Sequence, residues 1–187
     1  MSEPGALGVF GGSFDPPHAG HVLLAAYALA CAPIAGILVV PTFQHAFGKR
    51  SASFDDRVRM CERAFGGLAG VTVTRIEERL GGASYTVRTL EALGSERPGV
   101  PLRLLIGADV LPETPRWRQW ERVAALAPPY VVGRGGSDSP EDAPVLPTIS
   151  STEVRERYRI GGSVERWVPR AVDAYERAHG LYGTGAP

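Results

Sequence analysis

The stretch VFGGSFDPPHAGHVLL, from Val9 to Leu24, decides the fold. A short apolar run ends in two glycines and two prolines, and a second apolar run of helical length begins at Val22. This order predicts a strand, a loop and a helix. The helix is expected to begin near His18, because prolines are tolerated where the first amide hydrogens have no partner inside the helix. Such amides attract anions, so the start of this helix is a candidate phosphate site.

Two histidines make this candidate site more specific. His18 and His21 are three residues apart, so both imidazoles are expected on one face of the first helical turn. Gly20 lies between them and leaves no side chain to block a ligand. The plainer alternative is a turn followed by a histidine that is only a satisfied polar residue. The spacing nevertheless suits a polyphosphate.

Composition limits the classes of protein that need to be considered. The chain has 187 residues, of which 44% are hydrophobic, which predicts a single domain over residues 1–187 with a substantial core. The 20 basic and 20 acidic residues cancel, so no overall positive charge favours nucleic acid or a membrane surface as a partner. Neither a signal peptide nor a membrane-spanning run is apparent, which predicts a cytoplasmic protein. Cys31 and Cys61 lack metal-ligand spacing and are expected to be reduced, packed thiols.

Strand-like and helix-like patterns alternate along the rest of the chain. The first helix is expected to end at Cys31, with an inward stripe of Val22, Leu23, Ala26, Leu29 and Ala30. Further strands are expected over residues 37–40, 71–74, 102–106 and 130–132, with helices from a Ser53 capping box to Phe65 and from a Ser84 cap to Leu93. The alternation predicts an α/β fold, Rossmann-like and doubly wound, with five or six mainly parallel strands and ligands beyond their carboxyl ends. Residues 134–147, rich in Gly, Pro, Ser and acids, are predicted to be a mobile surface loop.

The motif GGSFDPPHAGH, from Gly11 to His21, resembles the signature of the HxGH nucleotidyltransferase superfamily. Its form is most similar to bacterial nicotinate-mononucleotide adenylyltransferases. Other nucleotide-binding patterns do not fit, because the first turn lacks GxGxxG and the only Gly-Lys pair lacks the spacing of a P-loop. The resemblance implies that ATP contacts Gly12, Ser13 and Phe14, and that His18 and His21 are the catalytic residues and also bind ATP.

Two later motifs extend the resemblance on the ATP side. The segment ISSTEVR, from Ile149 to Arg155, matches the superfamily's ISSTxxR element. Hydroxyls and amides at a helix start form a second anion site. By resemblance Ser151, Thr152 and Arg155 bind the β- and γ-phosphates of ATP, and Ile149 lies near adenine. The segment IGAD, which ends at Asp109, resembles a family element in which Gly107 and Asp109 bind ATP. Alternatively, the Asp109 carboxylate caps the following helix.

The acceptor side of the resemblance involves Tyr85, Thr86, Trp117, Arg134 and Lys49. The segment SYT from Ser84 resembles a family element that holds the pyridine carboxylate at a helix start, although an ordinary serine cap explains it equally well. The resemblance assigns Trp117 to stacking on the pyridine ring, whereas two core tryptophans, Trp117 and Trp120, would be the commoner arrangement. Arg134 matches an arginine that closes the family's fifth strand.

Lys49 is the only lysine in the chain, and compositional bias toward arginine is the plain explanation for that. It follows the second predicted strand, where a flexible ammonium could reach a phosphate. The surrounding segment departs from the PPHK-like segment of the family and resembles the YGK segment of eukaryotic-type nicotinamide-mononucleotide adenylyltransferases. The resemblance therefore leaves the choice of base open.

Since the tail from Trp167 to Tyr182 also resembles the family's C-terminal packing helix, the resemblance covers nearly the whole chain. It implies an enzyme that transfers the adenylyl group of ATP to nicotinate mononucleotide, giving deamido-NAD and pyrophosphate in NAD biosynthesis. Mg²⁺ is the expected cofactor, held by substrate and water rather than by protein ligands. The alternatives are a nicotinamide-mononucleotide or dual-specificity enzyme, a pantetheine-phosphate adenylyltransferase, another cytidylyltransferase-like enzyme and a non-catalytic nucleotide-binding module. No particular oligomeric state is predicted.

Overall fold

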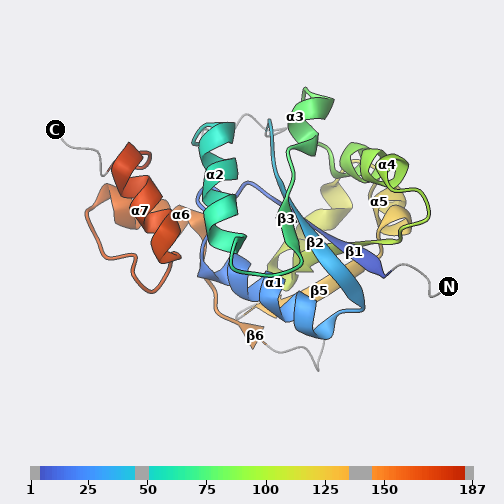
Figure 1. Cartoon of the computed structure of the whole chain (residues 1–187), viewed down its shortest axis with the longest axis horizontal. Helices are drawn as coiled ribbons and strands as arrows, with labels where there is room; N and C mark the ends of the chain where they lie inside the picture. The colour runs from blue at the N-terminus through green and yellow to red at the C-terminus, as the bar shows by residue number, and fades with distance from the viewer. Residues whose placement is uncertain (1–4, 45–50, 135–144, 184–187) are drawn as a thin grey trace.

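The computed structural model describes residues 5–44, 51–134 and 145–183. Its centre is a six-stranded sheet in the order β3-β2-β1-β4-β5-β6 (Figure 1). The strands are β1 (Ala6–Gly12), β2 (Ile34–Pro41), β3 (Val71–Val73), β4 (Leu102–Gly107), β5 (Pro129–Arg134) and β6 (Val145–Leu146). Every neighbouring pair is parallel, which confirms the predicted Rossmann-like class and the larger of the two predicted strand numbers.

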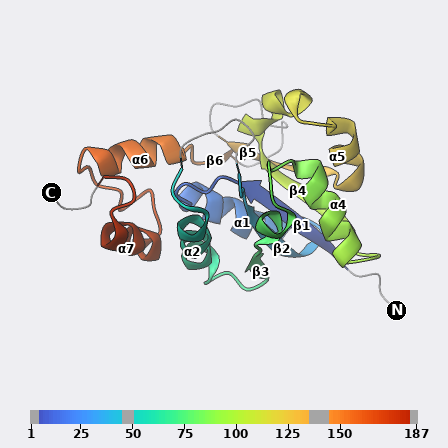
Figure 2. The same ribbon diagram turned by 90° about the horizontal axis from the view of Figure 1, so that it is seen from above.

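Helices connect the strands and cover both faces of the sheet. They are α1 (Ala19–Cys31), α2 (Phe54–Phe65), α3 (Ile76–Leu80), α4 (Thr86–Glu96), α5 (Trp120–Leu126), α6 (Ser151–Arg159) and α7 (Arg170–His179), with a 3₁₀ segment, η1 (Ala108–Arg116), after β4. Seen from above, α4 and α5 lie on the opposite side of the sheet from α2 and α7 (Figure 2). No helix among the described residues is long and apolar enough to cross a membrane.

The alternation of side chains along each strand divides the core into two layers. Phe10, Val39 and Leu105 pack with residues of α1, α2, α6 and α7. Their chain neighbours Val9 and Leu104 point the other way and pack with residues of α3, α4 and α5. Because both faces are covered, the strands need apolar residues at consecutive positions, which is the continuous pattern that the sequence shows.

The strand order changes direction at the neighbouring strands β1 and β4. From β1 the chain continues to β2 and β3 on one side, and from β4 it continues to β5 and β6 on the other, so the connections leave these two neighbouring carboxyl ends in opposite directions. A crevice forms at the carboxyl ends of strands where this happens. The fold therefore places the Gly12 end of β1 at a binding crevice.

Helix α1 begins and ends as predicted, but its predicted inward stripe is only partly right, since Val22 and Leu29 pack against the core whereas Leu23 and Ala30 are exposed. Gly20, Leu24, Ala25 and Ala28 are the buried residues, whereas Leu23 is 41% exposed. Nearly every residue from Val22 onward is apolar, so helical periodicity alone could not identify the face that packs on the sheet. The contact with the sheet decides the face.

Two predictions about helix starts had opposite outcomes. Ser53 caps α2 as predicted, and its hydroxyl accepts the Asp56 amide hydrogen at 3.1 Å. The predicted Ser84 cap of α4 is wrong, because the Ser84 hydroxyl instead accepts hydrogen bonds from the backbone amides of Phe43 and Gln44 at 3.1 and 3.2 Å. Ser84 thus fixes the chain that follows β2, and Tyr85 takes the cap position of α4.

Three further differences concern short or local features. Helix α3 has five residues and was not predicted, because so few turns give little periodicity. Val145 and Leu146 form β6 beside β5, so the prediction of a surface loop is wrong for these two residues. Residues 135–144 of the predicted loop lie outside the described residues. Both cysteines are free thiols as predicted, but only Cys61 is buried, so the prediction that Cys31 is packed is wrong.

Candidate active site

A cavity of about 810 Å³ opens at the carboxyl ends of β1, β2 and β4. Its size lies within the range of roughly 300–1,000 Å³ that small-molecule sites occupy. It is lined by the end of β1, the start of α1, the chain after β2, the start of α4, segment η1 and the chain before α6. All of these segments meet at the crevice that the strand order creates, so the site is a product of the fold rather than of one loop.

The two histidines of the first motif lie together on one wall of this cavity. His18 caps α1 and is 2% exposed, and its ring stacks on that of His21 with 3.7 Å between ring centroids. The His18 amide donates to Nδ1 of His21 at 3.1 Å. Because Nδ1 accepts, a neutral His21 carries its proton on Nε2 and is a hydrogen-bond donor through that atom. The predicted placement on one helical face is confirmed.

Glycine at position 20 makes room for a neighbouring side chain. A Cβ built there would lie 3.2 Å from two atoms of the His18 ring, so the glycine makes room for that ring. Similarly, a Cβ on Gly12 would meet the Phe14 ring at 3.2 Å. Phe14 is 1% exposed and packs edge-on against His21 at 4.9 Å between centroids. Phe14 thus supports His21 from behind, and its side chain does not line the cavity.

The second predicted motif opens α6 beside the first. Ser150 caps the helix, accepting the Glu153 amide hydrogen at 3.2 Å, and Ser151 donates its hydroxyl to the Pro16 carbonyl at 2.9 Å. Ile149, Ser150 and Ser151 line the cavity. The starts of α1 and α6 therefore lie side by side, joined by the Ser151 hydroxyl.

The structure does not bring Thr152 and Arg155 to the cavity wall. Arg155 Nη1 donates to the Asp15 carbonyl at 2.6 Å, and its Nη2 donates to the Thr152 hydroxyl at 3.2 Å. This arrangement gives no support to the predicted contacts of the two residues with phosphate. The reason is local: the first helical turn directs Arg155 toward the loop before α1 rather than toward the cavity.

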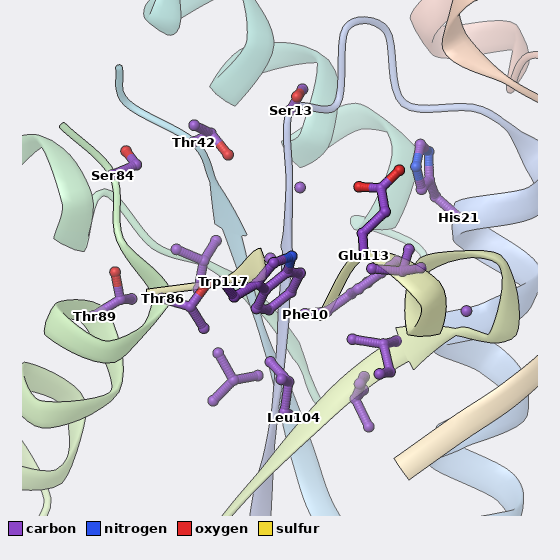
Figure 3. Close-up of a pocket in the computed structure, with 18 of the residues that line it drawn as sticks. Phe10, Ser13, His21, Thr42, Ser84, Thr86, Thr89, Leu104, Glu113 and Trp117 are labelled. Carbon is purple, nitrogen blue, oxygen red and sulfur yellow. The ribbon is translucent and has the colours of Figure 1, made fainter. Parts of the chain in front are cut away.

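Segment η1 supplies a carboxylate that sequence reasoning predicted and one that it missed. Asp109 lines the cavity, whereas Gly107 at the end of β4 takes the cap position, so the alternative in which Asp109 caps a helix is wrong. Glu113 also lines the cavity, and Figure 3 shows its carboxylate on the His21 side of Trp117. No sequence pattern marked Glu113, because a 3₁₀ segment with two prolines has no regular helical periodicity.

Hydroxyl side chains gather at the opposite end of the cavity. Figure 3 shows Thr42, Ser84, Thr86 and Thr89 on the far side from His21, with Trp117 between the two groups. Thr42 was missed, although its position directly after β2 could have indicated a site residue. Thr86 lines the cavity as predicted, and so does Tyr85.

Trp117 lines the cavity, and Trp120 packs behind it. The two indole rings are in edge contact, 5.8 Å apart at 86°, and Trp120 belongs to the core layer beneath α4 and α5. Trp117 therefore lines the cavity and Trp120 does not, although both indole rings are half-buried and pack against the same core layer. Trp117 and Tyr85 form what we call the aromatic end of the cavity. Arg118 also lies there, with its guanidinium 4.9 Å from the Tyr85 ring centroid.

A buried glutamate that sequence reasoning missed supports this end of the cavity. Glu77 is 9% exposed, and its two oxygens accept the Phe43 amide hydrogen at 2.9 Å and the Thr89 hydroxyl hydrogen at 3.0 Å. It thereby ties the chain after β2 to α4. A short acidic helix such as α3 carries no sequence signal for such a role.

The side chains of two predicted acceptor residues lie outside the described part of the chain. Lys49 lies outside the described residues. Arg134 ends β5, where it pairs with Leu146 of β6. Among the ranges that the structure describes, no group of three or more His, Cys, Asp or Glu side chains is arranged to hold a metal ion.

Comparisons with known proteins agree with the fold and with the predicted family. A family model described as cytidylyltransferase-like matches residues 9–157. A protein of Anaeromyxobacter sp. (strain K) named probable nicotinate-nucleotide adenylyltransferase is 43% identical, over 97% of this chain and 99% of its own length. A protein with the same name from Myxococcus xanthus is 35% identical, over 95% and 94% of the two chains.

A solved structure is similar over the same extent. The nicotinic acid mononucleotide adenylyltransferase of Plasmodium falciparum, in a structure described as complexed with NaAD, superposes with a TM-score of 0.84. The alignment covers 97% of this chain and 98% of that one, at 17% sequence identity. At this identity the likeness concerns the fold, and it extends over the whole sheet and both helical layers.

Proposed function

This chain belongs to the cytidylyltransferase-like family and, within it, to the nicotinate-nucleotide adenylyltransferases, and from that membership we propose how its residues work. The reaction is adenylyl transfer from ATP to nicotinate mononucleotide, which gives deamido-NAD and pyrophosphate in NAD biosynthesis. We take residues 1–187 as one nucleotidyltransferase domain, in keeping with relatives that match over 94–99% of their own length. The observation that carries the proposal is the stacked His18–His21 pair, which shares one cavity with the start of α6 and with Trp117.

The reaction requires no protein nucleophile. The phosphate of nicotinate mononucleotide is ionised at neutral pH and attacks the α-phosphorus of ATP in line. A new phosphoanhydride bond forms, the bond between the α-phosphorus and the bridging oxygen breaks, and pyrophosphate leaves with that oxygen. The protein therefore contributes positioning and charge stabilisation.

The first motif provides the groups closest to the transferring phosphate in this proposal. His21 donates through Nε2, as its Nδ1 already accepts the His18 amide hydrogen. The amides at Gly12 and Ser13 are proposed as further donors, and the positive end of the α1 helix dipole favours the same charge. Such donors stabilise the charge that develops as the leaving bond breaks.

The start of α6 is suited to the leaving pyrophosphate. Ser150 and Ser151 lie at the N-terminus of a nine-residue helix whose first amides have no partners within the helix. Adenine would lie beside Ile149, and Asp109 would accept hydrogen bonds from the ribose, next to the close backbone approach that Gly107 permits. Thr152 and Arg155 act indirectly in this arrangement, because Arg155 contacts the loop before α1 and Thr152 accepts a hydrogen bond from Arg155.

The acceptor base fits the aromatic end of the cavity. Trp117 offers a ring face for stacking on the pyridine, and Tyr85 and Thr86 lie at the start of α4, where backbone amides can bind a carboxylate. Lys49 is proposed to contact a phosphate of the bound substrates through its ammonium group. We also propose that Arg134 binds the acceptor, and this proposal rests on the family resemblance alone.

Magnesium is the proposed cofactor, held mainly by ATP oxygens and water. Of the three carboxylates that line the described part of the cavity, Glu77 is engaged by two hydrogen bonds and Asp109 is assigned to the ribose, so Glu113 is the one that would complete the coordination. One or two carboxylates beside substrate phosphates is the usual environment of this ion. When bound, it neutralises part of the charge on the transferring and leaving phosphates.

A panel of acceptors tests this function. The protein is incubated with ATP, Mg²⁺ and, in turn, nicotinate mononucleotide, nicotinamide mononucleotide, phosphopantetheine and flavin mononucleotide, while pyrophosphate release is followed. We expect release with the pyridine mononucleotides, fastest with nicotinate mononucleotide, and none above background with the other two. Release with phosphopantetheine alone would replace the proposal with the related reaction, and no release with any acceptor would favour a binding module.

A further inference from the structure

The loop from Ser13 to Pro16 carries the first motif into α1, and side chains from distant parts of the chain fix its backbone. The Ser13 carbonyl accepts a hydrogen bond from Arg57 Nη1 at 2.8 Å, and the Asp15 carbonyl accepts one from Arg155 Nη1 at 2.6 Å. Arg57 is 3% exposed and comes from α2, whereas Arg155 comes from α6. The loop is therefore held from the side that faces away from the cavity.

The Asp15 side chain is the centre of these contacts. It is 1% exposed, and its Oδ1 accepts the Ala52 amide hydrogen at 3.0 Å and the Tyr182 hydroxyl hydrogen at 2.7 Å. Its Oδ2 lies 3.6 Å from Arg155 Nη1 and has no hydrogen-bond partner among the described residues. A buried carboxylate is costly unless it is paired and hydrogen-bonded, so each of these few partners matters for where Asp15 sits.

Tyr182 reaches Asp15 from 167 residues away along the chain. Its own position is well fixed, because its backbone amide donates to Glu176 Oε1 at 3.0 Å and its ring stacks on Tyr158 with 5.9 Å between centroids. Burial raises the pKa of the Tyr182 phenol well above its usual value, so the hydroxyl stays protonated and donates throughout the neutral range. Tyr182 is not among the residues that line the cavity.

A displacement of Asp15 would also displace His18 and His21. Only Pro16 and Pro17 separate Asp15 from His18, and proline rings fix the backbone angle φ, so these two residues cannot absorb a displacement as a flexible link would. Ser151 Oγ also donates to the Pro16 carbonyl, which couples the same link to the start of α6. Both candidate phosphate-binding helix starts therefore depend on where Asp15 sits.

We infer that Tyr182 is a positioning residue for adenylyl transfer, acting through Asp15 on the loop that presents His18 and His21. The inference rests on the proposed function, because it concerns the geometry in which those histidines meet the transferring phosphate. In-line displacement is sensitive to misplacement of the reacting groups by fractions of an ångström. A tyrosine at the end of the chain thus contributes to turnover without touching either substrate.

The chain offers a matched control for the test. Tyr158 is also buried, stacks on Tyr182 and donates its hydroxyl to a carboxylate, but that carboxylate is Asp173 of α7, at 3.0 Å. Tyr158→Phe and Tyr182→Phe therefore each remove one phenolic hydroxyl that donates to a carboxylate, from the same aromatic pair. Only Tyr182→Phe changes the partners of Asp15.

Kinetics of both variants are measured with ATP and nicotinate mononucleotide, alongside thermal unfolding. We expect Tyr182→Phe to lower kcat by about tenfold with smaller changes in either KM, whereas Tyr158→Phe keeps kcat within about twofold of the wild type. A purely structural hydroxyl would lower the unfolding temperature in both variants and leave kcat of the folded enzyme unchanged. Equal kcat values for the two variants would overturn the inference.

A second variant keeps the test decisive if Tyr182→Phe folds poorly. Asp15→Asn retains an oxygen that can accept from Ala52 and Tyr182 but loses the charge that faces Arg155, and we expect its kcat to fall by at least tenfold. Adding Tyr182→Phe to Asp15→Asn should lower kcat by no more than about a further twofold, since both act through one loop. If the two substitutions lowered kcat by fully multiplicative factors, they would not act through one loop.

Failure of the proposed function and failure of this inference give different results. A wild type without turnover would refute the proposed function, whereas an active wild type with an unaffected Tyr182→Phe variant would refute only the inference.

Discussion

The variant His21→Ala is expected to lower kcat by about two to three orders of magnitude, the loss that follows removal of one preorganised donor to a developing charge. The structure gives the reason: Nδ1 of His21 accepts the His18 amide hydrogen, which leaves Nε2 to donate. His18→Ala should cause a loss of similar size, because the two rings stack at 3.7 Å and His18 caps the same helix. The measurement is steady-state turnover of the purified variants with both substrates saturating.

A histidine elsewhere in the chain controls for general effects of the substitution. His179 lies at the exposed end of α7, stacked on Tyr175, and does not line the cavity. His179→Ala should retain turnover within about twofold. Thermal unfolding of His21→Ala should stay close to that of the wild type, because the side chain is only partly buried. Near-normal turnover of folded His21→Ala would remove this residue from the proposed catalytic groups.

The second large effect is expected in the choice of acceptor. Nicotinate carries a carboxylate and nicotinamide a neutral amide, and the start of α4 at Tyr85 and Thr86 offers backbone donors that favour the acid. Two charge-assisted hydrogen bonds of about 1.5 kcal/mol each correspond to a preference on the order of a hundredfold in kcat/KM. Parallel kinetics with the two mononucleotides measure this preference. Equal efficiencies would contradict the assignment of nicotinate and leave adenylyl transfer itself intact.

Variants of Trp117 separate recognition of the ring from recognition of the carboxylate. Trp117→Ala should lower kcat/KM for both mononucleotides by a similar factor, because stacking depends little on the substituent of the ring. Trp117→Phe keeps an aromatic face and should recover most of the loss. A change in the ratio between the two acceptors, without a common loss, would mean that Trp117 contacts the carboxylate instead.

The fold could be predicted from the sequence because its signals are local. Glycines and prolines mark the end of β1 and the start of α1, and continuous apolar runs mark strands that are covered on both faces. The same runs hide which face of a helix is buried. In α1 the apolar residues continue from Val22 onward, so the packed face at Leu24 and Ala28 is decided by contact with the sheet.

The candidate site could be predicted only where a motif carries it. His18, His21, Ile149 and Ser151 line the cavity as expected, because each lies at the start of a helix beyond a strand end. Contacts between distant segments leave no local signal. Arg155 was expected at a phosphate but donates to the Asp15 carbonyl, 140 residues away along the chain.

Supporting residues were missed for the same reason. Glu77 and Tyr182 each hold another side chain or amide in place from a different element, and their residue types are common in positions without such a role. Ser84 illustrates the opposite error, since it has the residue type of a helix cap and yet binds the chain after β2. Residue type and spacing predict helices and strands, whereas tertiary contacts assign the supporting roles.

Isotopic labelling of ATP tests the central claim, transfer of the adenylyl group to the acceptor phosphate. The wild-type protein is incubated with nicotinate mononucleotide, Mg²⁺ and ATP labelled at either the α- or the γ-phosphorus, and the products are separated. We expect α-label to appear in deamido-NAD and γ-label in pyrophosphate, in equal amounts and only when the acceptor is present. Recovery of α-label in free AMP, or of γ-label in the acceptor, would show hydrolysis or phosphoryl transfer and contradict the account.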